Sequence, residues 1–216
     1  KTHSLFVYIS KVPLPLASNG KNSPKISIWL PISCSISKDL KKSLIKLSVI
    51  IPSRDEAENL LECISKIAQS LSDHFIENEI LVIDDGSTDN TAEIVKDLIV
   101  QFPCVKYIPN KGENGFGRAT RLGLEEFSGD AVAIMMADLS DSPQDLVRYW
   151  QKLQEGHECV FGSRFIPGGQ VIDYPKAKLL ANRIVNTIIR YAFKIRCNDV
   201  TNAFKIYRRE VIEGCR

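Results

Sequence analysis

Short apolar runs alternate with amphipathic segments along most of this 216-residue chain. The runs are rich in β-branched residues, which is typical of buried strands. The segments between them place apolar residues at helical spacing, as Leu60, Ile64, Ile67 and Leu71 show. Such alternation predicts an α/β fold in which βαβ units build a mainly parallel sheet flanked by helices. We expect strands over 47–52, 79–85, 105–110, 130–138 and 159–165, and helices over 54–71, 90–102, 118–127 and 142–154.

Polar and acidic side chains follow most of the predicted strands. Parallel sheets bind ligands at the carboxyl ends of their strands, so we expect these side chains to line one edge. The adjacent carboxylates Asp84 and Asp85 repel each other and need an offsetting partner, and such oxygen ligands suit Mg²⁺ or Mn²⁺ with phosphate. Helix capping or turn chemistry could explain Asp89 or Asp141 alone. The residues at this edge are Pro52, Ser53, Arg54, Asp55, Glu56, Asp84, Asp85, Gly86, Asn110 and Asp138.

Several common classes of site do not fit the sequence. The Gly-rich turn over 110–117, "NKGENGFG", has neither the P-loop spacing nor the dinucleotide-binding spacing, and it follows the third strand rather than the first. The six cysteines show no zinc-finger spacing, and none of the three histidines lies in a known nucleophile motif. The net charge of +2 gives no reason to expect a nucleic-acid partner. The scattered cysteines favour a reducing, cytoplasmic location.

The amino-terminal part of the chain has a different composition from the rest. Residues 1–45 are rich in Ser, Lys and Pro, and Asp39 is the single acidic residue there. No stretch of this segment is long and apolar enough to span a bilayer. We therefore predict a basic, disordered leader over 1–45 and one folded domain over 46–216.

Six segments, in this order, resemble the motifs of the family 2 glycosyltransferases. They are "SVIIPSRDEAENL", "EILVIDDGSTDNT", "NGFGRATRLGL", "IMMADLSDSP", "VFGSRFIPGG" and "NDVTNAFKIYRREV". The nearest branch is that of the dolichyl- or polyprenyl-phosphate mannosyltransferases. This resemblance implies a nucleotide-sugar-binding fold of the GT-A type. It also implies an inverting transfer of mannose or glucose, from GDP-mannose or UDP-glucose, to a polyprenyl or dolichyl phosphate.

The same resemblance assigns roles to individual residues. Asp138 and Arg164 would be catalytic, and Asp138 and Ser140 would hold Mg²⁺ or Mn²⁺. The chain departs from the family at Met136, which occupies the first position of the usual Asp-x-Asp motif. The acceptor would meet Arg164, Lys178, Asn186 and Lys205. The donor would meet Pro52, Ser53, Arg54, Glu56, Asp84, Asp85, Gly86, Asn110, Gly115, Ala137 and Asp138.

The segment 175–196 predicts an amphipathic helix with a basic polar side. Its apolar stripe runs through Leu180, Ile184, Ile188 and Tyr191 or Ala192. The stripe could lie on an anionic membrane surface, or it could pack on the domain core with its charges solvated. The first interpretation predicts a peripheral protein at the cytoplasmic face of a membrane.

Two other functions stay open at this point. One is transfer to a saccharide hydroxyl, which needs a general base, whereas a lipid phosphate is already anionic. The other is a catalytically weak module that only binds nucleotide sugars, which the substitution at Met136 favours.

Overall fold

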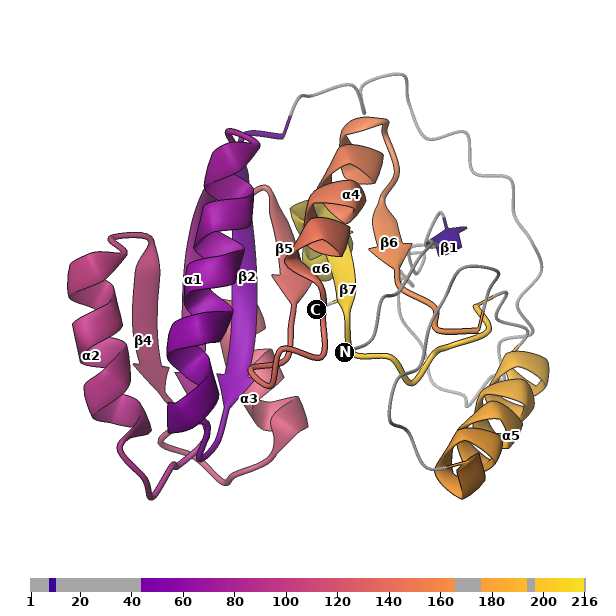
Figure 1. Cartoon of the computed structure of the whole chain (residues 1–216). Helices are drawn as coiled ribbons and strands as arrows, with labels where there is room; N and C mark the ends of the chain where they lie inside the picture. Colours follow the sequence, from indigo (N-terminus) through magenta and orange to yellow (C-terminus); the bar gives the residue numbers. More distant parts are fainter. Residues whose placement is uncertain (1–7, 11–43, 166–175, 194–196, 216) are drawn as a thin grey trace, which may run out of the picture.

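The computed structural model describes residues 8–10, 44–165, 176–193 and 197–215. They contain one sheet of seven strands in the order β1-β6-β7-β5-β2-β3-β4 (Figure 1). The predicted α/β class, with a sheet flanked by helices, is confirmed. The strands are β1 (Tyr8–Ser10), β2 (Lys46–Ser53), β3 (Glu77–Asp84), β4 (Val105–Pro109), β5 (Ala131–Ile134), β6 (Cys159–Phe161) and β7 (Lys205–Arg208).

Helices cover both faces of this sheet (Figure 1). α1, α2 and α4 share the larger hydrophobic core with one face, and α3 and α6 pack on the other. α5 lies apart from both layers, toward the end at which β2 and β5 finish (Figure 1). The helices are α1 (Ala57–Asp73), α2 (Thr91–Gln101), α3 (Phe116–Glu126), α4 (Pro143–Gln154), α5 (Lys176–Ala192) and α6 (Arg209–Glu213).

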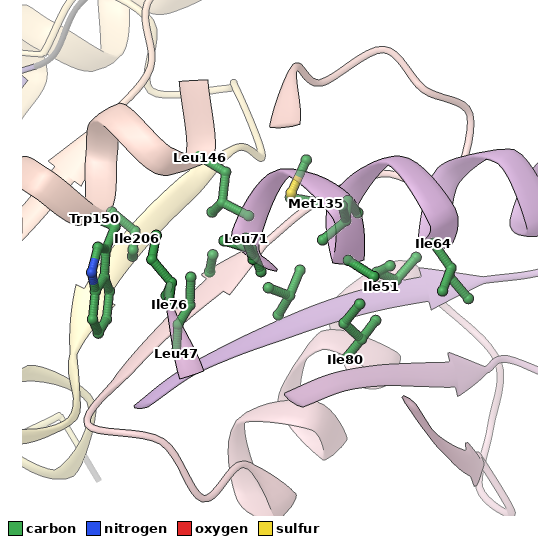
Figure 2. Packing of buried hydrophobic residues seen from close by; sticks show 14 of the residues in the cluster. Leu47, Ile51, Ile64, Leu71, Ile76, Ile80, Met135, Leu146, Trp150 and Ile206 are labelled. Carbon is green, nitrogen blue, oxygen red and sulfur yellow. The ribbon is translucent and has the colours of Figure 1, made fainter. Parts of the chain in front are cut away.

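The central strand β2 explains why two layers of helices are needed. Its residues from Leu47 to Ser53 are all buried, so neither face can be left to solvent. Val49 and Ile51 join the core beneath α1 and α4, whereas Ile50 joins the cluster beneath α3. Figure 2 shows the first of these cores, in which Leu71 of α1 and Trp150 of α4 converge. Full burial of one such aliphatic side chain contributes about 1.5–3 kcal/mol.

A glycine lets α3 approach this strand closely. A Cβ atom at Gly123 would lie 2.6 Å from Cγ2 of Ile50, which is closer than side chains tolerate. The smallest residue at this helical position is therefore a packing requirement.

The sheet is parallel on one side and antiparallel on the other. β5, β2, β3 and β4 are parallel neighbours, as the sequence predicted. β7, which we did not predict, runs antiparallel between β5 and β6. The predicted strand over 130–138 is too long, because β5 ends at Ile134. The N–H of Met136 donates to the Asp141 carboxylate (2.9 Å), so the chain leaves the ladder there.

Part of the predicted leader has a place in the sheet. β1 pairs antiparallel with β6, with Tyr8 opposite Phe161 and Ser10 opposite Cys159. The other residues before Leu44 lie outside the described part of the chain. Leu44 itself is buried, and its N–H donates to the side chain of Gln154 (3.1 Å). The predicted division of the chain at residue 45 stays a prediction.

A buried carboxylate stabilises the amino-terminal edge of the sheet. Glu79 is 2% exposed and forms ion pairs with Lys46 (3.2 Å) and Lys106 (2.8 Å). It also accepts hydrogen bonds from Ser48 Oγ and from the backbone and hydroxyl of Ser128. Burial alone would raise the pKa of this carboxyl, but the hydrogen bonds from Lys106, Ser48 and Ser128 outweigh burial and hold its pKa far below the usual value.

Candidate functional site

The carboxyl ends of β2, β3 and β4 lie level with one another. Ser53 pairs with Asp84, and Asp84 pairs with Pro109, so the loops after these strands emerge side by side. Pro52, Ser53 and Ala137 are buried, whereas Arg54 is exposed and Glu56 is half-buried. A ligand at this edge would therefore meet the side chains of the loop residues first.

Asp55 joins the first two loops, a role that the sequence analysis did not assign to it. Its backbone takes the left-handed conformation (φ 55°). Its Oδ1 atom accepts hydrogen bonds from the N–H groups of Thr88 (2.7 Å) and Asp89 (3.3 Å), and its own N–H donates to Ser87 Oγ. Asp89 in turn accepts from the N–H groups of Ala57 and Thr91, at the starts of α1 and α2. The capping explanation for Asp89 thus holds.

Asp84 is fixed by its neighbours at the end of β3. It accepts hydrogen bonds from the hydroxyl of Tyr107 (2.5 Å) and the N–H of Ser87 (2.9 Å). Burial would raise the pKa of Asp84, but the hydrogen bonds from Tyr107 and Ser87 outweigh burial and lower it. Asp84 is therefore a buried, ionised residue that shapes the turn.

Asp85 positions the Gly-rich turn. Its Oδ1 atom accepts from the side-chain amide of Asn110 (2.7 Å), and its Oδ2 atom accepts from the N–H of Gly115 (2.6 Å). These donors are the offsetting partners that the adjacent carboxylates required. Three residues predicted to bind the donor are thus brought together by direct contact.

Gly86 lets the chain turn sharply beside this pair. Its φ of +75° is in the region that favours glycine, and an added Cβ would lie 2.9 Å from the side chain of Asn114. The absence of a side chain here lets Asn114 of the Gly-rich turn approach the loop after β3 closely.

The loop after β5 carries the predicted metal ligands. Asp138 is exposed, and its Oδ1 atom accepts a hydrogen bond from the N–H of Ser140 (2.9 Å). Leu139 between them has a positive φ of 59°, which is strained for a branched residue. Strain of this kind is common at ligand sites.

Asp141 has the opposite environment. It is 8% exposed, and its Oδ2 atom accepts from the N–H of Met136. Burial is the largest cause that raises the pKa of this carboxyl to about 7; the charge of Asp138 also raises it, whereas the Met136 hydrogen bond and the Arg164 charge lower it. Asp141 holds the loop in shape through its bond to Met136, and its carboxylate is too buried to bind a metal ion that is shared with a substrate.

A buried cysteine shows that this loop meets the first helix. The Cys63 thiol of α1 donates to the carbonyl of Met136 (3.7 Å). Burial raises its pKa to about 12, assisted by the negative charges of Asp141, Asp138 and Glu56. Carboxylates from the loops after β2 and β5 are therefore both close enough to Cys63 to raise the pKa of its thiol.

The residues around Asp138 offer a divalent cation only a few protein ligands. Within the described residues, no group of three or more His, Cys, Asp or Glu side chains could hold a metal ion. One exposed carboxylate, with Ser140 beside it, still fits Mg²⁺ or a similar ion, because Mg²⁺ keeps several waters and also binds substrate phosphates. The loss of the family's first Asp at Met136 leaves this minimal arrangement.

Arg164 is held by a residue that the sequence analysis missed. Its Nε and Nη2 atoms donate to the two oxygens of Asp199 (2.8 and 2.7 Å), and its backbone N–H donates to the same carboxylate (2.9 Å). Asp199 is fully buried, and the Arg164 side chain is 15% exposed. The motif "NDVTNAF" contained Asp199, but only the fold shows that it forms an ion pair.

The other residues predicted to meet the acceptor have separate environments. Nζ of Lys205 donates to the carbonyls of Val200 (3.0 Å) and Asn202 (2.5 Å), and burial lowers the pKa of this lysine. Asn186 is buried and donates to Thr201 Oγ1 (2.9 Å), whereas Lys178 is exposed on α5. Lys205 and Asn186 therefore support the turn that carries Asp199.

The apolar stripe of α5 is open to solvent. Leu180, Ile184, Ile188 and Tyr191 are 51% to 77% exposed. The interpretation that this stripe packs on the domain core is therefore wrong, because the packed side of α5 centres on Asn186. None of the described helices has the length and apolar composition needed to cross a bilayer.

Comparison with known proteins places these features in a family. The sequence profile described as "Glycosyl transferase family 2" matches residues 48–215. The chain is 36% identical over 172 residues to a dolichol-phosphate mannosyltransferase of Pyrococcus furiosus, covering 79% of this chain and 48% of the relative. It is 31% identical over 169 residues to a polyprenol monophosphomannose synthase of Mycolicibacterium smegmatis, covering 76% of this chain and 62% of the relative. The chain thus spans less than two thirds of each relative's length.

Solved structures share the fold at lower identity. A glucosyl-3-phosphoglycerate synthase of Mycobacterium tuberculosis, crystallised with Mn²⁺, UDP and phosphoglyceric acid, superposes with a TM-score of 0.56. Its sequence is 17% identical, and the match covers 77% of this chain and 56% of that one. The predicted GT-A fold is confirmed by this likeness.

Proposed function

Because this chain belongs to glycosyl transferase family 2, we propose that it transfers a sugar from a nucleotide-sugar donor to a polyprenyl or dolichyl phosphate. The observation that carries the proposal is the arrangement at one edge of the sheet. There, the exposed carboxylate of Asp138 lies in the loop after β5, whose Asp141 experiences the charge of Arg164, and Thr201 links Arg164 to the polar side of α5, the helix whose apolar stripe is exposed. An anionic headgroup and an apolar tail would each find a matching partner.

The donor side is proposed to bind GDP-mannose or UDP-glucose. Arg54, Glu56 and the turn organised by Asp85 would surround the nucleotide, since carboxylates and backbone groups accept and donate hydrogen bonds to a base or ribose. The names of the two relatives favour mannose. Mg²⁺ or Mn²⁺, held by Asp138 with Ser140, would neutralise charge on the donor diphosphate.

The transfer needs little from the protein besides positioning and charge. A phosphate oxygen of the acceptor forms a bond to the anomeric carbon, the bond from that carbon to the nucleotide diphosphate breaks, and the configuration inverts. No residue has to remove a proton, because the acceptor phosphate is anionic near neutral pH. Arg164 would stabilise the phosphate charges, and the loops would align the reacting atoms.

One specific observation favours a second function. Met136 leaves a single exposed carboxylate for the cation, so the chain could bind nucleotide sugars without transferring them. Turnover separates this binding module from a transferase.

The test is a transfer assay with the whole chain. The protein would be incubated with labelled GDP-mannose or UDP-glucose, vesicles that contain polyprenyl phosphate, and Mg²⁺ or Mn²⁺. The proposal predicts label in an organic-extractable product with one donor and none when the lipid lacks its phosphate. Tight donor binding without product would favour the binding module, and product only with a saccharide acceptor would contradict the lipid acceptor.

The proposal includes a peripheral site of action at the cytoplasmic face of a membrane. α5 joins an exposed apolar stripe to exposed basic residues, including Arg183 and Arg190. Such helices lie in the interface of anionic membranes, where a lipid phosphate would be within reach.

A further inference from the structure

The turn between α5 and β7 connects Arg164 to the proposed membrane helix. Asp199 forms the forked ion pair with Arg164. Two residues later, the Thr201 hydroxyl is 3.5 Å from both Asp199 Oδ1 and Arg164 Nη2. The same hydroxyl contacts Asn182 Oδ1 (2.8 Å) and Asn186 Nδ2 (2.9 Å) of α5. A continuous polar path therefore runs from Arg164 to α5.

We infer that Asp199 is a positioning residue that acts through Arg164, and that Thr201 extends this positioning to α5. The inference rests on the function proposed above and adds residues to which no role was assigned. Neither residue would touch the substrates. Their role is to fix the position of the Arg164 side chain relative to α5, so that a lipid phosphate bound near α5 lies within reach of the guanidinium.

The geometry of the ion pair supports a positioning role. The planar guanidinium of Arg164 donates to Asp199 through Nε and Nη2, and the backbone N–H of the same residue donates to the same carboxylate, so the side chain has little freedom to rotate. Loss of the Asp199 carboxylate would leave this partly buried cation without its ion-pair partner.

The turn that carries Asp199 is braced on two further sides. Lys205 of β7 donates to the carbonyls of Val200 and Asn202. The Asn202 side chain donates to the carbonyl of Gly162, just after β6 (3.2 Å). Because these contacts hold the turn against the sheet, Asp199 has a fixed position and in turn fixes the position of Arg164.

The experiment compares Asp199→Asn, Thr201→Val and Thr201→Ser with wild type in the vesicle transfer assay. Asp199→Asn keeps the volume but removes the charge, and we expect kcat to fall on the order of tenfold to a hundredfold. Thr201→Val should lower kcat roughly threefold to tenfold, the effect of losing hydrogen bonds, and Thr201→Ser should restore it. The Kd for the donor nucleotide should stay within about twofold of wild type in all three.

Glu79→Gln is the matched control. It also removes a buried, ion-paired carboxylate, but at the opposite edge of the sheet. It should reduce thermal stability while kcat per folded molecule stays at the wild-type value, which separates positioning from loss of stability.

Each outcome decides the inference. Wild-type kcat in folded Asp199→Asn would overturn it; if that variant does not fold, wild-type kcat in Thr201→Val, at an exposed position, would overturn it. A drop in donor affinity equal to the drop in kcat would show a merely structural effect. Absence of product from the wild-type protein would overturn the proposed function itself, and the inference with it.

Discussion

Asp138 and Asp141 show how one loop separates two carboxylates by environment. Asp138 is exposed and precedes Leu139, which has a positive φ, so its carboxylate is available to a cation. Asp141 is buried, accepts a backbone hydrogen bond and has a pKa of about 7. Of these two carboxylates, therefore, only Asp138 is open to the proposed cation, and Asp141 supports the loop.

Replacement of Asp138 by Ala should remove the link between cation and nucleotide. We expect sugar transfer to fall by roughly a hundredfold, because loss of a metal ligand costs well over about 1.4 kcal/mol, or tenfold. Titration of the nucleotide diphosphate by calorimetry should also lose its dependence on Mn²⁺. Asp97→Ala, an exposed acid on α2, is the control and should behave as wild type. Full turnover in Asp138→Ala would rule out the metal assignment.

At the scale of elements, α1 and α5 use the same apolar periodicity in different ways. α1 buries Leu60, Ile64, Ile67 and Leu71 completely against the sheet. α5 exposes its stripe and is attached through polar contacts at Asn186. An exposed apolar stripe of this size is costly in water and indicates an interaction surface.

Charged substitutions on α5 should separate membrane binding from donor binding. In the double variant Ile184→Glu and Ile188→Glu, we expect vesicle sedimentation to fall at least tenfold, since each buried isoleucine contributes about 1.5–3 kcal/mol. Transfer to vesicle-bound lipid phosphate should fall in parallel, while the Kd for the donor stays the same.

Val100→Glu is the control for this experiment, because Val100 is 84% exposed on α2 and lies outside the stripe. Equal sedimentation of wild type and the double variant would show that α5 does not bind the bilayer.

At the scale of the whole molecule, the two edges of the sheet have different tasks. The amino-terminal edge carries the Glu79 network, which is ion-paired and buried. The carboxyl-terminal edge carries the strained and exposed loop residues of the site. Glu79 and Asp84 therefore respond to pH with the opposite sign to Asp141, because their pKa values are lowered and that of Asp141 is raised.

Stability should pass through a maximum between about pH 4 and 5 in protein treated with EDTA. Glu79 and Asp84 have folded-state pKa values below their unfolded values, so their contribution is present above about pH 4 and is lost as pH falls further. Asp141 has a raised pKa, so its contribution is present below about pH 4 and is lost as pH rises through 7. Urea unfolding between pH 3 and 8 would measure both limbs, each on the order of 2 kcal/mol.

Asp141→Asn is the check on the upper limb. This variant should have a nearly flat free energy of unfolding between pH 5 and 8, and it should still lose stability below pH 4. A rise in stability of the wild-type protein from pH 5 to 8 would contradict the assignment to Asp141.

Much of the parallel half of the fold could be predicted from local patterns. β2, β3 and β4 follow runs of β-branched residues, and Ser142 and Pro143 begin α4 as expected. β7 was missed, because its short "KIYR" segment becomes a strand through its pairing with β5 and β6. Pairing partners that are distant in sequence leave no local signal.

The candidate site was likewise predicted in part. The acids at the strand ends were expected at one edge, and the sheet register brings Ser53 and Asp84 together there. The roles of Asp55 as a link between loops and of Asp199 as the partner of Arg164 were not expected. Both depend on contacts between loops that only the folded sheet brings together.

The sequence by itself determined the alternation of strands and helices and the set of polar residues at the strand ends, because these follow from periodicity and composition along the chain. It also determined the family, through the six motifs that resemble those of the family 2 glycosyltransferases. The tertiary structure decided which carboxylates are buried or exposed, since burial depends on what the rest of the chain packs around them. It also decided that Asp199 holds Arg164 and that the α5 stripe faces solvent. The sequence gives the identity of each ionisable side chain, but packing between segments that are distant in the sequence sets the environment of that side chain.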